Sequence, residues 1–107
     1  MTDQKKTRRQ LLEEFVSQKP DDAFSRYGLA MECMNSGDPA AADIHFRALL
    51  ARNADYIPAY LMYAQLLARE SRSTEAKQVL STGIVAAAKK GDQHATSEME
   101  ALLNDLS

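Results

Sequence analysis

The chain repeats itself at a spacing of 34 residues, and this repeat limits the possible folds more than any single segment does. Alanines match at Ala30 with Ala64 and at Ala42 with Ala76, among other positions. Large or apolar residues match at further positions, Leu29 with Tyr63, Cys33 with Leu67 and Phe46 with Leu80. The period indicates two stacked copies of one structural unit, with alanines where its segments approach closely and bulky side chains filling the gaps.

Composition favours helices as the elements of this unit. The 107 residues include 17 Ala and 12 Leu but only 6 Val and Ile together, and Ala and Leu are the stronger helix formers. Turn and capping residues, such as Gly37, Asp38 and Pro39, divide the chain into stretches of helical length. Six helices are expected, over residues 4–18, 22–35, 39–52, 56–70, 74–89 and 93–106. Their short connections favour antiparallel neighbours, so the predicted fold class is all-α.

The repeat resembles the tetratricopeptide repeat (TPR) family, whose 34-residue unit is a pair of antiparallel helices. The first copy matches the family pattern at Leu29, Ala30, Gly37, Ala42 and Phe46. The second copy matches it at Tyr60, Tyr63, Ala64, Leu67, Ala76, Leu80 and Gly83. The chain departs from the pattern at Arg26, in place of a large aromatic residue, at Leu49, in place of a small residue, and at Ala54 and Ala88, in place of proline.

The resemblance implies a single domain, residues 1–107, built as a short right-handed solenoid of antiparallel helix hairpins. Repeats 23–56 and 57–90 would form its middle. Segment 1–20, a helix with a basic tail, and segment 91–107 would cover its two ends. The first helix has an apolar face for this purpose, formed by Leu11, Leu12, Phe15 and Val16.

Residues that could carry chemistry are few and scattered. His45, His94 and Cys33 lack the spacing of a metal site and have no nucleophile–base arrangement around them. We expect His45 and His94 at helix surfaces and Cys33 on a packed face. No glycine-rich phosphate loop occurs in the sequence. We therefore expect no enzyme activity, no catalytic residue, no metal and no cofactor.

The first helix of each repeat lines a concave groove in TPR-like proteins. The resemblance places this groove on Phe24, Tyr27, Met31, Met34 and Asn35 of the first copy and on Leu61, Met62, Gln65, Ala68 and Arg69 of the second. Several family members clamp a peptide's terminal carboxylate there with Lys and Asn, but Tyr27, Met31 and Met62 hold the matching positions, so this clamp is absent. The surface is apolar and rich in thioethers, which adapt to irregular partners. The same stripe is also typical of a core, into which the N-terminal helix could fold.

The first functional hypothesis is a non-catalytic protein–protein interaction module. It would bind a hydrophobic or helical segment of a protein or peptide partner whose identity the sequence does not give. The alternative is a structural protein that self-assembles through opposite charges. Its basic end would be Lys5, Lys6, Arg8 and Arg9, and its acidic end residues 91–107.

The remaining expectations follow from charge and hydropathy. A net charge of −2 without a long basic stripe predicts no nucleic-acid partner, and no apolar run is long enough for a membrane span. The N-terminus lacks the apolar stretch of a secretory signal, and the single Cys fits a reducing compartment, so we expect a cytoplasmic location. The oligomeric state is expected to be a monomer or a weak homo-oligomer.

Overall fold

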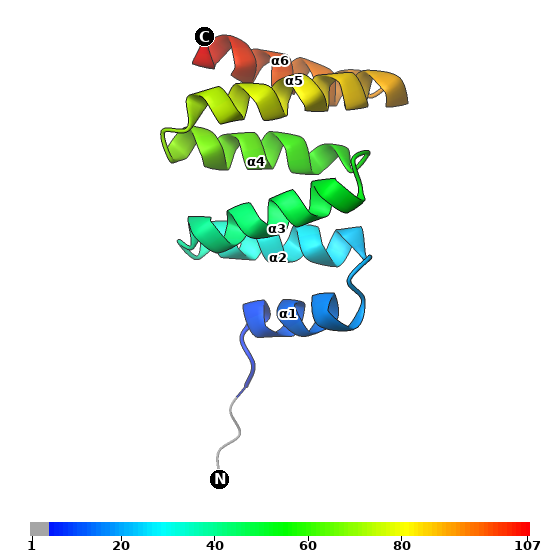
Figure 1. Cartoon of the computed structure of the whole chain (residues 1–107), viewed down its shortest axis with the longest axis vertical. Helices are drawn as coiled ribbons and strands as arrows, with labels where there is room; N and C mark the ends of the chain where they lie inside the picture. Colours follow the sequence, from blue (N-terminus) through cyan, green and yellow to red (C-terminus); the bar gives the residue numbers. More distant parts are fainter. Residues whose placement is uncertain (1–4) are drawn as a thin grey trace.

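The computed structural model describes residues 5–107, and its regular structure there is entirely α-helical. The six helices are α1 (Arg8–Gln18), α2 (Ala23–Asn35), α3 (Pro39–Arg52), α4 (Ile57–Arg69), α5 (Ser73–Lys90) and α6 (Gln93–Leu106). They stack in chain order along the long axis of the molecule, with α3 in front of α2 and α5 in front of α6 (Figure 1). The predicted all-α class and the six helices are confirmed.

The N-terminal boundary differs most from the expected ranges. The first helix begins at Arg8, and residue 4, where it was expected to begin, lies outside the described residues. Thr7 sets this boundary with a capping box, because its hydroxyl accepts from the Gln10 amide and the Gln10 side chain accepts from the Thr7 amide.

The two central hairpins have the same backbone plan. Adding 34 to the bounds of α2 gives the bounds of α4, and adding 34 to those of α3 gives residues 73–86 of α5. Four of the alanines matched in the sequence, Ala30, Ala42, Ala64 and Ala76, are fully buried. Small side chains at these points let the paired helices approach closely. The assignment of residues 23–56 and 57–90 as the repeats stays a prediction.

The last helix, α6, closes one end of the stack. It packs on both α5 and α4. Met99 is fully buried there, and Leu102, Leu103 and Leu106 pack against the hydrophobic core. A left-handed glycine, Gly91, ends α5 and lets the chain turn back within two residues (φ 71°).

The first helix, α1, packs on α2 alone. Only Leu12 and Val16 of its expected apolar face are covered, whereas Leu11 and Phe15 are exposed. The expected apolar face is therefore confirmed for Leu12 and Val16 and wrong for Leu11 and Phe15. The reason is that a single neighbouring helix covers only one narrow stripe of a helix surface.

Ion pairs add to the attachment of α1. Arg9 donates to Asp38, which caps α3, and Arg8 lies 3.2 Å from Glu32 of α2. The hydrogen bond from Arg9 holds the pKa of the Asp38 carboxyl below its usual value. Lys6 pairs with Glu14 within the same segment. These three cations therefore pair with carboxylates of the same chain.

Candidate functional site

The helices α2, α4 and α6 lie side by side, because α4 contacts both of the others. Where the three meet, their side chains leave a hollow of about 270 Å³. Tyr27 comes from α2, Leu61 and Met62 come from α4, and Ala95 and Glu98 come from α6. We call this hollow, with the half-buried side chains beside it on the same helices, the groove. No α1 residue is among those that line the hollow in the described part of the chain, so α1 does not fill it.

The predicted binding residues do not all lie in this hollow. Tyr27, Leu61 and Met62 line it and are half-buried. Met31 of α2 and Gln65 of α4 are half-buried but lie outside the lining, as does Ala68.

The remaining predicted positions are either exposed or buried in the core. Phe24 is 75% exposed, and Asn35 and Arg69 are also exposed. Met34 is 6% exposed and belongs to the hydrophobic core, so its placement on the groove surface was wrong. Cys33 beside it is fully buried, as expected for a packed face, and burial raises the pKa of its thiol.

Sequence reasoning missed the contribution of α6, which forms one wall of the groove. This helix follows α4 at an offset of 36 residues, so that Ala95 matches Ala59 and Leu102 matches Leu66. At the same offset His94 and Glu98 fall on Pro58 and Met62, which line the hollow from α4. A comparison at an offset of 34 does not align α6 with α4. A comparison at 36 would have found this match.

Aromatic rings and carboxylates form the rim. The ring centroids of Tyr27 and Tyr56 lie 5.3 Å apart at an interplanar angle of 49°. Burial raises the pKa of both phenols; the neighbouring Tyr56 adds to the rise at Tyr27, and the carboxylate of Asp22 adds to the rise at Tyr56. On α6, the exposed His94 lies 3.4 Å from Glu98, a contact that is ionic only when the imidazole is protonated.

The groove can hold apolar side chains. Its floor offers thioether, aliphatic and aromatic surface, and its α6 edge offers the carboxylates of Asp92 and Glu98. Asp92 is already engaged as the cap of α6, accepting from the Ala95 amide at 3.0 Å. Across residues 5–107 no group of three His, Cys, Asp or Glu side chains is placed to hold a metal ion.

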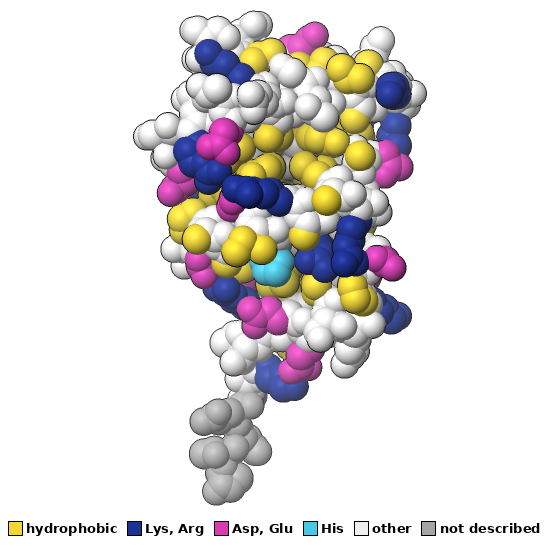
Figure 2. Space-filling view, in the orientation of Figure 1, with side chains coloured by type: hydrophobic (Ala, Val, Ile, Leu, Met, Phe, Trp, Pro, Cys, Tyr) yellow, Lys and Arg dark blue, Asp and Glu magenta, His cyan; other side chains and the backbone are white. Residues whose placement is uncertain are grey.

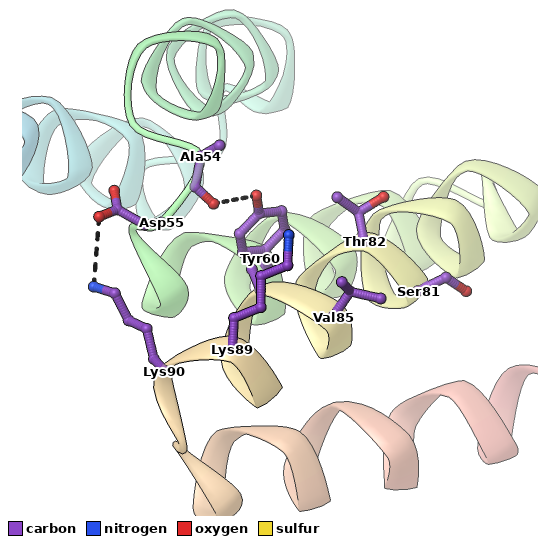
Figure 3. Close-up of a pocket in the computed structure, with 9 residues that line it drawn as sticks. Ala54, Asp55, Tyr60, Ser81, Thr82, Val85, Lys89 and Lys90 are labelled. Carbon is purple, nitrogen blue, oxygen red and sulfur yellow. Dashed lines mark hydrogen bonds and ion pairs between the residues drawn. The ribbon is translucent and has the colours of Figure 1, made fainter.

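A larger hollow of about 580 Å³ lies on another side of the molecule, beside the last turns of α5. Loop residues Ala54 and Asp55, Tyr60 of α4, and Val85 and Lys89 of α5 are among its lining (Figure 3). Hydrophobic side chains gather on the face of Figure 2 at the level of α4 and α5, with Lys and Arg along its edges. No sequence motif pointed to this hollow.

Solved structures with the same arrangement identify the fold family. A tetratricopeptide repeat domain protein from Salinibacter ruber, solved in solution, superposes with a TM-score of 0.79 at 28% identity. The match covers 83% of this chain and 90% of that one. A crystal structure of a tetratricopeptide repeat domain protein from the same organism gives a TM-score of 0.75 at 28% identity, covering 79% of this chain and 96% of that one. The chain has a TPR-like fold.

A third structure extends the likeness of this TPR-like chain over most of its length. A protein from Bordetella parapertussis superposes with a TM-score of 0.81 at 25% identity, covering 95% of this chain and 89% of that one. No protein-family model matches the sequence, and no curated protein matches it significantly. The TPR fold is in general a protein-interaction fold and is typically non-catalytic. None of the helices in the described range is long and apolar enough to cross a membrane.

Proposed function

We propose that this TPR-like chain is an adaptor that holds a hydrophobic or helical segment of a partner protein in the groove of α2, α4 and α6. The observation that carries the proposal is the convergence of Tyr27, Leu61 and Met62 on one hollow with α6 as its second wall. These side chains are half-buried, so a partner that covers them removes apolar surface from water.

The size of the hollow favours anchor side chains over a whole small molecule. Its volume of about 270 Å³ lies below the usual range of drug-sized sites. One or two large apolar side chains from a helix turn fit this space, while the rest of the segment lies along α4. Met31 and Gln65 extend the contact surface in that direction, and Arg69 lies about 16 Å along α4 from Pro58, at the far end.

Methionine supports a site that accepts different sequences. Met62 at the floor and Met31 beside it have flexible, polarisable side chains that adjust to the shape of a partner. Tyr27 and Tyr56 provide the rigid surface that anchoring contacts use most often.

Selection of peptides on the immobilised protein tests the proposal. A random 12-residue peptide library is selected on the whole chain, and a recovered peptide is titrated against Met62→Glu and, as a matched control, Ile44→Glu. Ile44 is an exposed aliphatic residue of α3 outside the groove. We expect Met62→Glu to weaken binding at least about tenfold, and Ile44→Glu to change it less than about twofold. Equal effects of the two substitutions, with both variants folded by circular dichroism, would contradict the proposal.

The alternative of charge-driven self-assembly is not favoured by the contacts of the basic end. Three of its four cations, Lys6, Arg8 and Arg9, pair with carboxylates of the same chain. We therefore propose that the chain forms no stable oligomer through its ends. Light scattering on a sizing column should give the same mass at low and high salt. A mass that falls as salt is added would instead support the self-assembly hypothesis.

A further inference from the structure

At the hollow beside α5, an arginine of the first hairpin has no counterpart in the second. At the offset of 34, Pro20 and Asp21 correspond to the lining residues Ala54 and Asp55, and Arg52 corresponds to Ala86. Arg52 reaches from α3 to its neighbouring loop, donating to the Pro20 carbonyl oxygen at 3.0 Å and to Asp21 at 2.7 Å. The methyl group of Ala86 cannot span this distance.

The extra length of α5 brings in different cations. The matched part of α5 ends at residue 86, but the helix continues for one more turn to Lys90. Lys90 lies 3.6 Å from Asp55 and so replaces the contact of Arg52 with Asp21. Lys89 makes no ion pair with any residue of the 5–107 range, and its side chain points across the hollow toward Tyr60 (Figure 3). One cation without a counter-charge therefore stands at the rim.

The floor of the hollow is apolar and held in place. Val85, in the second half of α5, is 55% exposed, and Ala86 and the Tyr60 ring continue this apolar surface. The Tyr60 hydroxyl donates to the Ala54 carbonyl oxygen at 2.5 Å, which fixes the ring against the loop. The hollow thus combines an apolar wall with the ammonium group of Lys89.

We propose that this hollow is a second binding site, separate from the groove, for a protein segment in which a large apolar side chain is flanked by carboxylates. The apolar side chain covers Val85 and Ala86, and a carboxylate pairs with Lys89. A cationic segment fits poorly, because Lys89 and Lys90 outnumber Asp55 at the rim. The volume of about 580 Å³ is sufficient for one large side chain and its neighbours.

Two matched peptides test this assignment. One is an acetylated and amidated peptide in which Asp alternates with Phe and Leu, and the other has Asn at every Asp position. Each is titrated into the isotope-labelled whole chain by NMR. We expect the Asp peptide to shift the amide signals of Thr82 and Val85 and to bind about three- to fivefold more tightly than the Asn peptide. Equal affinities, or no shift at these two residues with either peptide, would overturn the proposal.

Three variants locate the interaction. Lys89→Gln should remove the preference for the Asp peptide, whereas Lys77→Gln, about 18 Å away on the same helix, should retain it. Ala86→Arg recreates the arginine of the first hairpin and should block both peptides. Equal effects of Lys89→Gln and Lys77→Gln would overturn the proposal even where Ala86→Arg does not fold. The groove is not involved in this test, so its failure leaves the proposed adaptor function standing.

Discussion

The α2–α3 and α4–α5 hairpins share a backbone plan but pack it with different side chains. In α4–α5 the large Tyr60 lies against Gly83, where an added Cβ would be only 2.6 Å from the Tyr60 Cβ. At the matching positions of α2–α3, Leu49 is fully buried in place of the glycine and Arg26 stands in place of the ring. The comparison teaches that one backbone plan can be packed in two ways, with a glycine against a ring in one hairpin and a buried leucine at the glycine position in the other.

The hairpins also differ in how well their polar groups are satisfied. In α2–α3 the Arg26 Nε and the His45 Nδ1 are buried without a hydrogen-bond partner. The matching residues of α4–α5 are Tyr60, whose hydroxyl is hydrogen-bonded, and Val79, which has no polar group in its side chain. Buried polar atoms without partners are costly, so we expect α2–α3 to be the less stable hairpin.

The largest expected effect comes from removing the side chain that fills the first hairpin. Leu49→Ala leaves a cavity that the surrounding helices only partly close, so the free energy of unfolding should fall by about 2–5 kcal/mol. Urea unfolding followed by circular dichroism measures the change, with exposed Ala51→Gly as a control for helix propensity, at about 1 kcal/mol. A loss no larger than that of the control would show that Leu49 does not occupy a tightly packed site.

The reverse change tests the second hairpin. Gly83→Ala places a methyl group 2.6 Å from the Tyr60 Cβ and 2.7 Å from the Met99 Sδ. Although alanine favours helices, we expect a net loss of about 1–3 kcal/mol, because both neighbours must move. Ser81→Ala, at an exposed position of the same helix, should be nearly neutral under the same conditions. A Gly83→Ala variant more stable than the starting chain would contradict the close packing.

Val79 is the residue that matches His45 in the second hairpin, and placing valine at position 45 should remove a pH dependence of the folding stability. Burial, together with the positive charges of Arg26 and Arg9, lowers the pKa of His45. The unfolded chain therefore binds a proton more readily, so stability falls as the pH drops through the unfolded value of about 6.5.

His45→Val should therefore stabilise the fold by about 1 kcal/mol and flatten its stability between pH 7.5 and 5.5. Urea midpoints at these two pH values measure both effects. His94→Gln, at an exposed position, should retain the slope. The same slope in His45→Val and in the starting chain would rule out His45 as its source.

The smallest expected effect concerns the turn inside each hairpin. Gly37 has a φ of 81° and its counterpart Ser71 has a φ of 62°, a left-handed conformation that costs a residue with a Cβ. Ser71→Gly should thus raise the unfolding temperature slightly, corresponding to about 0.5–1 kcal/mol. Thermal unfolding of Ser71→Gly and of the nearby Ser73→Gly, a helix position with ordinary φ, separates this effect from flexibility. Destabilisation by both substitutions would contradict a costly left-handed conformation at Ser71.

The fold could be predicted from the sequence because its information is local and repeated. The offset of 34 and the capping residues Gly37, Asp38 and Pro39 place the helices to within a few residues. The site could be predicted only in part. Tyr27 and Met62 follow from the register, but Met34 turned out to be buried.

Two features of the surface depend on packing that no single helix reveals. The α6 wall follows at an offset of 36 because α5 is four residues longer than α3, while the loop that follows it is two residues shorter. The hollow beside α5 has the short side chain of Ala86 at the position where the first hairpin has Arg52. This difference matters only because Arg52 reaches the neighbouring loop, which the structure shows and the sequence does not. The relation between such positions is three-dimensional, and helical periodicity does not encode it.

Methyl NMR of methionine tests the central claim most directly, because the chain carries its own controls. Met62 lines the groove and Met31 lies beside it, whereas Met34 is buried in the core. A peptide selected on the whole chain is titrated into protein labelled at the methionine methyl groups. We expect large shifts for Met62, smaller shifts for Met31 and almost none for Met34. A bound peptide that leaves the Met62 signal in place would show that binding occurs elsewhere and would contradict the account.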